Sequence, residues 1–467
     1  MSTCEKSQIS PAQRLLAQVK SGFAEVLKGL RADSDRARVQ RTALMAFAIR
    51  IVSAGVAYLS QVVLARWMGS FEYGLFVYVW VWVLILGGLA PLGFNTALIR
   101  FVPEYTEKGE LEALRGILAS SRAVALAVGT VLAGVAFTVL WYAPNVVEQP
   151  YVLPAFLALL CLPVFALSDV NDCVGRAYGW INLGLIPPFI MRPLLVLFSM
   201  LAAYAVGLEM VATTAVGCAI LATWVAAVVQ HILIERKIRK VVPSGARAYR
   251  RGFWLKASLP LVMILGFELF LQNTDILVIS AYMSPSDVGI YFAALKTIGL
   301  VSFVHFAVGA AVAKRFSALN ARGEKEKLHA IVRDAAAWTF WPSLAGATAL
   351  LILGKPLLWL FGPEFTSAYG VMFILAVGLL IRATLGPAEY LFNMLGQQNI
   401  CAAILFATAV LNLVLNFVLV PPFGLFGAAT ATSTALIGAA VMFYIAGRKR
   451  LGLDISIWPS LRQWMNS

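Results

Sequence analysis

The chain has 467 residues, of which 60% are hydrophobic and only 13% are charged. Soluble globular proteins average about 45–50% apolar and about 25% charged residues, so this composition excludes an ordinary soluble domain. The formal net charge is +14. The placement of the basic residues, described below, explains this charge without a nucleic-acid partner.

The apolar residues gather in twelve long blocks. A membrane-spanning helix needs about 20 mainly apolar residues, and backbone polar groups inside the hydrocarbon core must be hydrogen-bonded within the chain. We therefore predict an all-α polytopic membrane protein with about twelve transmembrane helices. The blocks have the approximate limits 43–66, 75–98, 119–142, 151–171, 181–206, 211–233, 257–282, 288–313, 335–354, 368–392, 400–420 and 424–446.

The basic residues predict how the chain is oriented. If the N-terminus is cytoplasmic, the loops and termini on that side hold 31 of the 37 Lys and Arg residues. Only Arg66 and Lys355 fall on the other side, and the remaining four lie inside the apolar blocks. Because cytoplasmic loops are enriched in Lys and Arg, we expect both termini to be cytoplasmic.

The first 40 residues are polar and lack the short apolar core of a cleavable signal peptide. Several apolar residues in this segment fall on one helical face, with Lys20, Lys28 and Arg31 nearby. This pattern predicts an amphipathic helix on the cytoplasmic leaflet, and a disordered basic tail is the alternative. The apolar residues are Leu15, Leu16, Val19, Phe23, Val26, Leu27 and Leu30.

The cysteines and nucleotide motifs give no sign of a cofactor. The five cysteines (Cys4, Cys161, Cys173, Cys218 and Cys401) are odd in number and have no metal-ligand spacing. No Gly-x-x-x-x-Gly-Lys-Ser/Thr motif occurs, so ATP is not expected to be the direct energy source. We expect no disulfide, metal or cofactor.

The two halves of the chain repeat each other. Met68–Phe76 aligns with Met283–Tyr291 at an offset of 215, and Arg100-Phe101 falls on Arg315-Phe316 at the same offset. Later segments fit an offset of 217, which places Asp172 on Glu389. Each half holds six predicted helices. An even number returns the chain to the same side, so the halves would be related by a pseudo-two-fold axis along the membrane normal.

This repeat predicts two six-helix lobes that rock around a central site. The expected division is a cytoplasmic amphipathic segment 1–40, an N-lobe 41–233, a basic cytoplasmic linker 234–256, a C-lobe 257–447 and a cytoplasmic tail 448–467.

Four basic residues lie inside the apolar blocks: Arg50, Arg192, Lys296 and Arg382. Each such charge costs about 2.5–3.5 kcal/mol at the membrane centre, so we predict a cationic, substrate-binding cavity. Structural ion pairs are the alternative. Arg50 is near enough to the cytoplasmic edge to snorkel. Arg382 lies seven residues, or two helical turns, from Glu389, which favours a local ion pair.

Three acids also lie in the apolar blocks: Glu268, Asp275 and Glu389. Membrane carboxylates can relay protons or bind a coupling cation, but these acids could equally neutralise the four bases. Glu268 and Asp275 are seven residues apart and could form one acidic stripe. His305 is either a proton switch or a packed, hydrogen-bonded side chain.

Leu64–Phe76, together with Gln272–Leu277 leading into Val288–Ala294, resembles the polysaccharide-exporter branch (O-antigen flippases) of the superfamily that also contains multidrug and lipid II exporters. The resemblance extends over about 40–447 and identifies the branch better than the cargo. It implies a bacterial inner-membrane flippase that moves undecaprenyl-pyrophosphate-linked oligosaccharide to the outer leaflet for O-antigen or exopolysaccharide synthesis. A polysaccharide polymerase and a chain-length regulator are possible partners.

Two other functions remain as alternatives. A cation-coupled multidrug or small-solute exporter usually carries cations and would place acids, rather than bases, in its cavity. A membrane-embedded glycan polymerase needs catalytic residues on sizeable outer loops, whereas the longest outer loops here run over only about 142–151 and 355–367. We therefore expect a transporter and not an enzyme.

Overall fold

The computed structural model describes residues 35–142 and 149–458, and within these ranges it is helical with no β-strand. The predicted all-α membrane fold is confirmed. The apolar face expected over Leu15–Leu30 lies outside the described residues.

The helices of the first half are α2 (Asp35–Leu89), α3 (Phe94–Glu107), α4 (Leu111–Tyr142), α5 (Gln149–Ala158), η2 (Leu159–Cys161), α6 (Leu162–Ala177), α7 (Ile181–Ile186), η3 (Pro187–Met191), α8 (Arg192–Ala205) and α9 (Ala212–Val241). Those of the second half are α10 (Arg251–Tyr282), α11 (Pro285–Gly299), α12 (Ser302–Ala321), α13 (Lys325–Ile352), α14 (Gly354–Phe361), η4 (Pro363–Ala368), α15 (Tyr369–Ala383), α16 (Ala388–Met394), α17 (Gln398–Ala446) and η5 (Gly447–Leu451).

The described residues contain nine stretches long and apolar enough to cross a membrane, or ten if the bent pair α11–α12 is one crossing. Two of these stretches have 60 and 54 residues, more than twice what a bilayer requires. Each turns back at a non-helical glycine, Gly69 or Gly424. Hydrogen bonds from Tyr73 to Gln61 and from Asn412 to Thr432 join the arms of these hairpins. Counting each hairpin as two crossings, and the bent pair as one, gives the twelve predicted.

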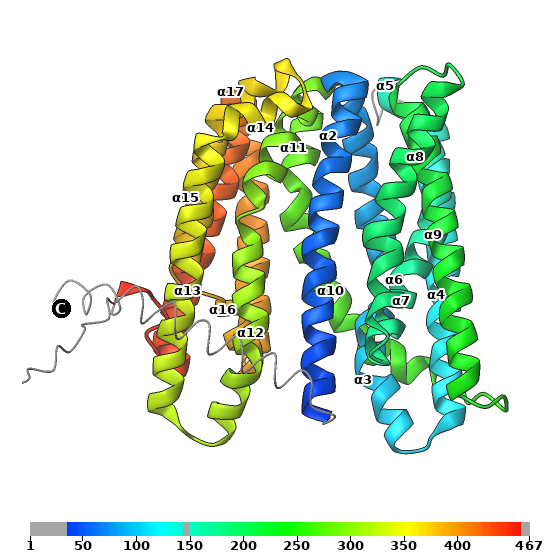
Figure 1. Ribbon diagram of the computed structural model, residues 1–467, viewed down its shortest axis with the longest axis vertical. Helices are drawn as coiled ribbons and strands as arrows, with labels where there is room; N and C mark the ends of the chain where they lie inside the picture. Colours follow the sequence, from blue (N-terminus) through cyan, green and yellow to red (C-terminus); the bar gives the residue numbers. More distant parts are fainter. Residues whose placement is uncertain (1–34, 143–148, 459–467) are drawn as a thin grey trace, which may run out of the picture.

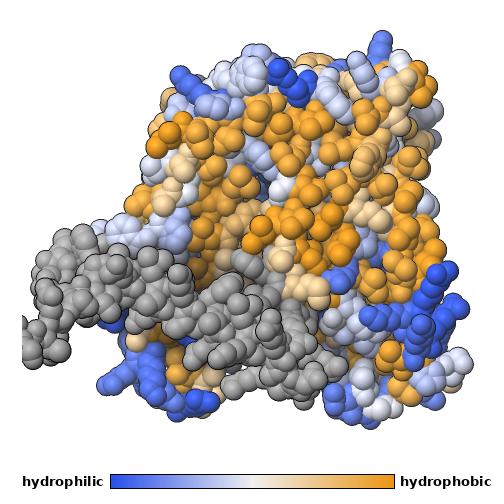
Figure 2. Space-filling model, in the orientation of Figure 1, coloured by the Kyte–Doolittle hydropathy of each residue, from blue (hydrophilic) through white to orange (hydrophobic). Residues whose placement is uncertain are grey.

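The helices form two groups on either side of α2 and α10, with α4 and α6–α9 in one group and α12–α17 in the other (Figure 1). We call the end that carries loops 108–110, 242–250 and 322–324 the basic end. The opposite end, with the turns at Gly69, Gly207 and Gly362, is the neutral end. Between the two ends, the face drawn in Figure 2 is largely hydrophobic where it is coloured, as a bilayer-spanning protein requires.

The hydrophobic core is shared at one end and divided at the other. One cluster near the neutral end combines Tyr73 and Phe76 of the first half with Tyr291 and Phe365 of the second. Toward the basic end, residues of the first half pack with Trp254 in one cluster, and residues from Val312 to Ile455 form another. The two lobes are therefore joined at the neutral end and have separate cores at the basic end.

The link between the lobes is fixed to the first lobe. Arg115 donates hydrogen bonds of 2.8 Å to the carbonyl oxygens of Pro243 and Ala246. Trp254, at the start of α10, is fully buried, and its Nε1 donates to the Tyr105 hydroxyl at 2.9 Å. The start of α10 thus packs in the core of the first lobe, and the exact limits predicted for the linker and lobes stay predictions.

The first residues of the predicted tail pack on the second lobe. After η5, Leu453, Ile455 and Ile457 are buried. The Ile457 N–H donates to the carbonyl of Thr384 at 2.9 Å, just where α15 ends. This contact satisfies a carbonyl that the helix end would otherwise leave unpaired.

We predict that Trp254→Ala lowers the free energy of unfolding by about 3–5 kcal/mol, because it removes a large buried side chain. Thermal unfolding in detergent measures the loss. Trp141→Ala is the matched control, since Trp141 is 64% exposed. Equal stability losses in the two variants would contradict the docking of α10 on the first lobe.

Candidate functional site

Arg192 and Lys296, two of the four predicted membrane cations, lie beside aromatic rings and have no acidic neighbour within the described residues. Arg192 begins α8, directly after the π-helical turn η3. Its guanidinium carbon lies 5.1 Å from the ring centroid of Phe165 and 5.5 Å from that of Trp80. Lys296 is exposed on α11, with its Nζ 4.8 Å from the Phe292 ring centroid. Among the described residues neither cation forms an ion pair.

Arg192 and Lys296 lie at similar depths in different lobes. Measured from the neutral end, Arg192 lies thirteen residues from Ala205 and Lys296 eleven residues from Pro285, or roughly 20 and 16 Å at about 1.5 Å per residue, near the middle of a bilayer. Arg192 belongs to the first lobe, whereas Lys296 belongs to α11, the helix that packs against α2 of the opposite half. The two unpaired cations therefore lie one in each lobe.

Arg50 is half-buried on α2, nearer the basic end, with its guanidinium carbon 4.3 Å from the Phe189 ring centroid. It makes no ion pair within the described part of the chain, although Asp172 is near enough to interact with it electrostatically. Asp172 instead pairs with Arg176 at 2.8 Å. Asp169 accepts a 2.6 Å hydrogen bond from Asn95.

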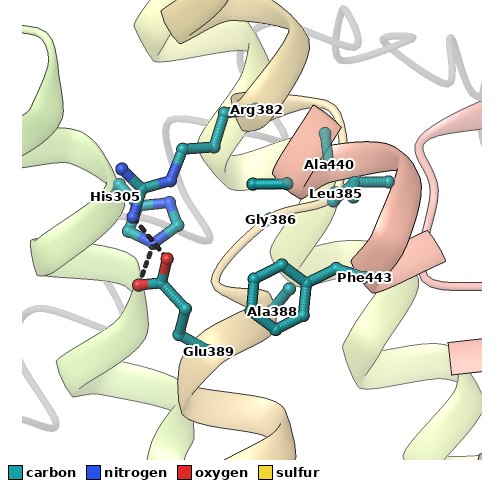
Figure 3. A pocket seen from close by; sticks show the side chains of 9 residues that line it. His305, Arg382, Leu385, Gly386, Ala388, Glu389, Ala440 and Phe443 are labelled. Carbon is teal, nitrogen blue, oxygen red and sulfur yellow. Dashed lines mark hydrogen bonds and ion pairs between the residues drawn. The ribbon is translucent and has the colours of Figure 1, made fainter. Parts of the chain in front are cut away.

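Arg382 and Glu389 form an ion pair. Arg382 Nη2 lies 2.6 Å from Glu389 Oε1, and His305 Nε2 lies 3.9 Å from Oε2 of the same carboxylate (Figure 3). The helix is interrupted between them, because α15 ends at Ala383 and α16 begins at Ala388. The pair borders a small pocket, otherwise lined by Leu385, Gly386, Ala388, Ala439, Ala440 and Phe443.

Asp275 lies in a buried cluster of oxygen-bearing side chains. Its Oδ2 accepts hydrogen bonds from Tyr291 at 2.7 Å and Thr432 at 2.6 Å. Its Oδ1 accepts from Asn416 at 3.0 Å and Asn412 at 3.5 Å. The amide oxygens of both asparagines are buried with no hydrogen-bond donor among the described residues. Carboxylate, amide and hydroxyl oxygens are ligands for hard cations, so this cluster has the donor set of a cation site.

Glu268 has different surroundings from Asp275. It is exposed, accepts a 3.3 Å hydrogen bond from Gln272, and lies within electrostatic reach of Glu389 and Arg382. Asp275 is only 4% exposed. The stripe expected from their seven-residue spacing therefore does not form one site.

The sequence analysis did not single out Tyr291, Asn412, Asn416 or Thr432. A signal was present, because Asn412 and Asn416 are four residues apart in an apolar block and so share a helical face. Their proximity to Asp275 depends on how α17 packs against α10, which one sequence does not reveal.

Two family models match the chain, one in each half. Residues 39–173 match the family described as "Polysaccharide biosynthesis protein". Residues 260–418 match the MatE family.

Two archaeal relatives are similar in sequence. An uncharacterized membrane protein of Methanocaldococcus jannaschii is 26% identical over 411 residues, which cover 82% of this chain and 78% of that protein. The "Probable low-salt glycan biosynthesis flippase Agl15" of Haloferax volcanii is 24% identical over 165 residues. The match to Agl15 spans only 35% of either protein.

Two solved structures share the fold. An inward-facing transporter of the multidrug resistance MATE family has a TM-score of 0.68 at 14% identity, covering 87% of this chain and 94% of that one. The lipid II flippase MurJ in an inward closed conformation has a TM-score of 0.68 at 13% identity, covering 87% and 88%. Three of the proteins described above are named as a transporter or a flippase, namely the MATE-family transporter, MurJ and Agl15, in agreement with the prediction that the chain is not an enzyme. The chain is therefore similar in sequence to the polysaccharide biosynthesis family in its first half and to the MatE family in its second, and it has the fold of a MATE transporter and of MurJ, as the resemblance implied.

Proposed function

We propose that the protein is a flippase for lipid-linked oligosaccharides, working by alternating access between its two lobes. The observation that carries this proposal is the pair of mid-membrane cations, Arg192 and Lys296, without acidic partners among the described residues. Aromatic rings beside them provide cation–π attraction, which only partly offsets the loss of water. An anionic ligand entering between the lobes would supply the missing partner.

A polyprenyl-pyrophosphate head group fits these two cations. Charge-assisted hydrogen bonds to phosphate oxygens are among the strongest in proteins. Arginine offers a planar fork for bidentate contact, and lysine acts as a point charge. The glycan would occupy the space between the lobes while the polyprenyl tail remains in lipid.

The names of similar proteins support this class of cargo. Agl15 is named a probable glycan biosynthesis flippase, and MurJ a lipid II flippase. The first lobe matches a polysaccharide biosynthesis family. We propose polysaccharide polymerases and chain-length regulators as partners, and the only basis for them is the proposed oligosaccharide cargo.

We place the basic end in the cytoplasm, with both termini on that side, because cytoplasmic loops are enriched in Lys and Arg. In a bacterium this membrane would be the inner membrane, the carrier undecaprenyl pyrophosphate, and the product an O-antigen or exopolysaccharide. The two relatives above are archaeal, so the proposal covers the plasma membrane of either kind of prokaryote.

We further propose that Asp275 and its four neighbours bind a monovalent cation that drives the cycle. The neighbours come from α11 and from both arms of the α17 hairpin. A cation there would neutralise the buried carboxylate and use the two amide oxygens that lack donors. Glu268 and Glu389 stay alternative coupling acids, although Glu389 is already paired with Arg382.

A cation-coupled exporter of multidrug or small-solute type is the second candidate. The match of the second lobe to the MatE family favours it. A cationic drug would have to pass Arg192 and Lys296, which no carboxylate neutralises within the described residues, so electrostatic repulsion disfavours this cargo.

We predict that Arg192→Ala and Lys296→Ala each slow the flipping of a fluorescent lipid-pyrophosphate oligosaccharide in proteoliposomes by about 10–150-fold. This is the range expected from losing a charged hydrogen bond worth about 1.5–3 kcal/mol. Arg100→Ala is the control, because the Arg100 side chain is 75% exposed and its ion pair is with Glu104 on the same helix. Wild-type flipping rates in both Arg192→Ala and Lys296→Ala would exclude a cationic substrate site.

We predict that sodium or a proton gradient accelerates flipping by the wild type and that Asp275→Asn removes the acceleration, because the carboxylate charge attracts the cation. The rate is measured with each gradient imposed or collapsed. Thr430→Ala is the control, since Thr430 is exposed and its hydroxyl donates to the carbonyl oxygen of Phe426 on its own helix. An undiminished wild-type rate with both gradients collapsed would remove ion coupling.

We predict that Arg382 contributes to stability through Glu389. In a double-mutant cycle, Arg382→Met and Glu389→Gln should couple by about 1–2 kcal/mol in the free energy of unfolding. The exposed pair Arg100–Glu104 should couple by less than about 1 kcal/mol. Additive effects of Arg382→Met and Glu389→Gln would show that Arg382 is free for substrate.

A further inference from the structure

The backbones of the two lobes come into close contact where α2 crosses α11. A Cβ atom added at Gly74 would overlap the carbonyl oxygen of Pro285 and lie 3.0 Å from the backbone nitrogen of Gly289. A Cβ added at Gly289 would lie 2.7 Å from the carbonyl oxygen of Ser70 and 3.2 Å from the nitrogen of Gly74. Neither glycine has a positive φ. Close backbone contact, and not an unusual conformation, is therefore what requires glycine at both positions.

This crossing obeys the symmetry of the sequence repeat. The offset of 215 residues relates Gly74 to Gly289 and Ser70 to Pro285. Gly74 faces Pro285, and Gly289 faces Ser70. The repeat therefore converts one of these contacts into the other. When two related units meet through equivalent residues, their contact lies on the two-fold axis that relates them. The glycine crossing therefore lies on the pseudo-two-fold axis about which the lobes are related.

Aromatic contacts between the lobes surround the crossing. The ring of Tyr58 lies 5.6 Å from that of Phe361, and the ring of Tyr73 lies 6.0 Å from that of Phe365. The Tyr58 hydroxyl is 3.0 Å from Thr297 Oγ1. Toward the basic end, by contrast, the buried apolar residues form separate clusters, one of the first half with Trp254 and one of residues from Val312 to Ile455.

We propose that Gly74 and Gly289 form the gate at the neutral end of the protein. The gate closes because two bare backbones meet on the symmetry axis, and it separates when the lobes rock to open that end. Any side chain at either position holds the lobes apart and shifts the population toward the open state. This inference rests on the proposed alternating-access cycle, but it does not depend on the identity of the cargo.

The test measures the distance between spin labels at Leu208→Cys and Ile352→Cys by pulsed electron resonance, in a variant that lacks the five native cysteines. Both positions lie at the neutral end, one in each lobe, and are 55% and 73% exposed. The test variants are Gly74→Ala and Gly289→Ala. The controls are Gly55→Ala on α2 and Gly299→Ala on α11, where an added Cβ would have no neighbour within 4 Å.

We expect both test variants to lengthen the distance between the labels by several ångströms and both controls to leave it unchanged. Gly289→Ala is the milder change, so it carries the test if Gly74→Ala does not fold. A folded Gly289→Ala variant with the wild-type distance distribution would overturn the proposal. If the label distance increases in both test variants but the wild type flips no glycan, the gate proposal stands and only the proposed cargo is wrong.

Discussion

The free-energy cost of moving charged side chains from water into the membrane is the constraint on which the sites of this structure depend. A charge at the centre of a membrane costs about 2.5–3.5 kcal/mol even on the mildest scale, and each intramembrane charge here meets that cost differently. Arg382 pairs with Glu389, and Asp275 accepts four hydrogen bonds. Arg192 and Lys296 lie beside aromatic rings and form no ion pair within the part of the chain that the structure describes. The two cations without ion pairs are the basis for the proposed anionic cargo, and the buried, hydrogen-bonded Asp275 is the basis for the proposed coupling ion.

The arrangement of the hydrophobic clusters allows the two lobes, and the sites they carry, to move relative to each other. The lobes share one hydrophobic cluster at the neutral end and have separate clusters at the basic end. A closely packed core resists continuous deformation, so each lobe is expected to move as a unit. The start of α10 packs in the first lobe through Trp254, while its later residues, Asp275 among them, bond to the second. Helix α10 thus connects the candidate cation site to the relative position of the lobes.

Hydropathy was enough to predict the twelve crossings, because the bilayer imposes both length and apolarity. The repeat was readable because polar and glycine matches are rare in an apolar chain, and Gly74 and Gly289 were among them. The seven-residue spacing of Arg382 and Glu389 suggested their pairing, although it assumed a continuous helix and the structure interrupts that helix at Thr384–Pro387. The asparagines around Asp275 were missed because their proximity arises from tertiary packing. Spacing along one helix also grouped Glu268 with Asp275, whereas the Glu268 side chain is exposed and that of Asp275 is buried.

The central claim is that Arg192 and Lys296 bind a lipid pyrophosphate. The most direct measurement is the Kd of undecaprenyl pyrophosphate for the purified protein in detergent, compared with that of uncharged undecaprenol. We expect the pyrophosphate to bind at least about tenfold more tightly, since a charged hydrogen bond contributes about 1.5–3 kcal/mol. We expect this preference to disappear in the Arg192→Ala, Lys296→Ala double variant. Equal affinities for the two lipids in the wild type, or an unchanged preference in the double variant, would contradict the account.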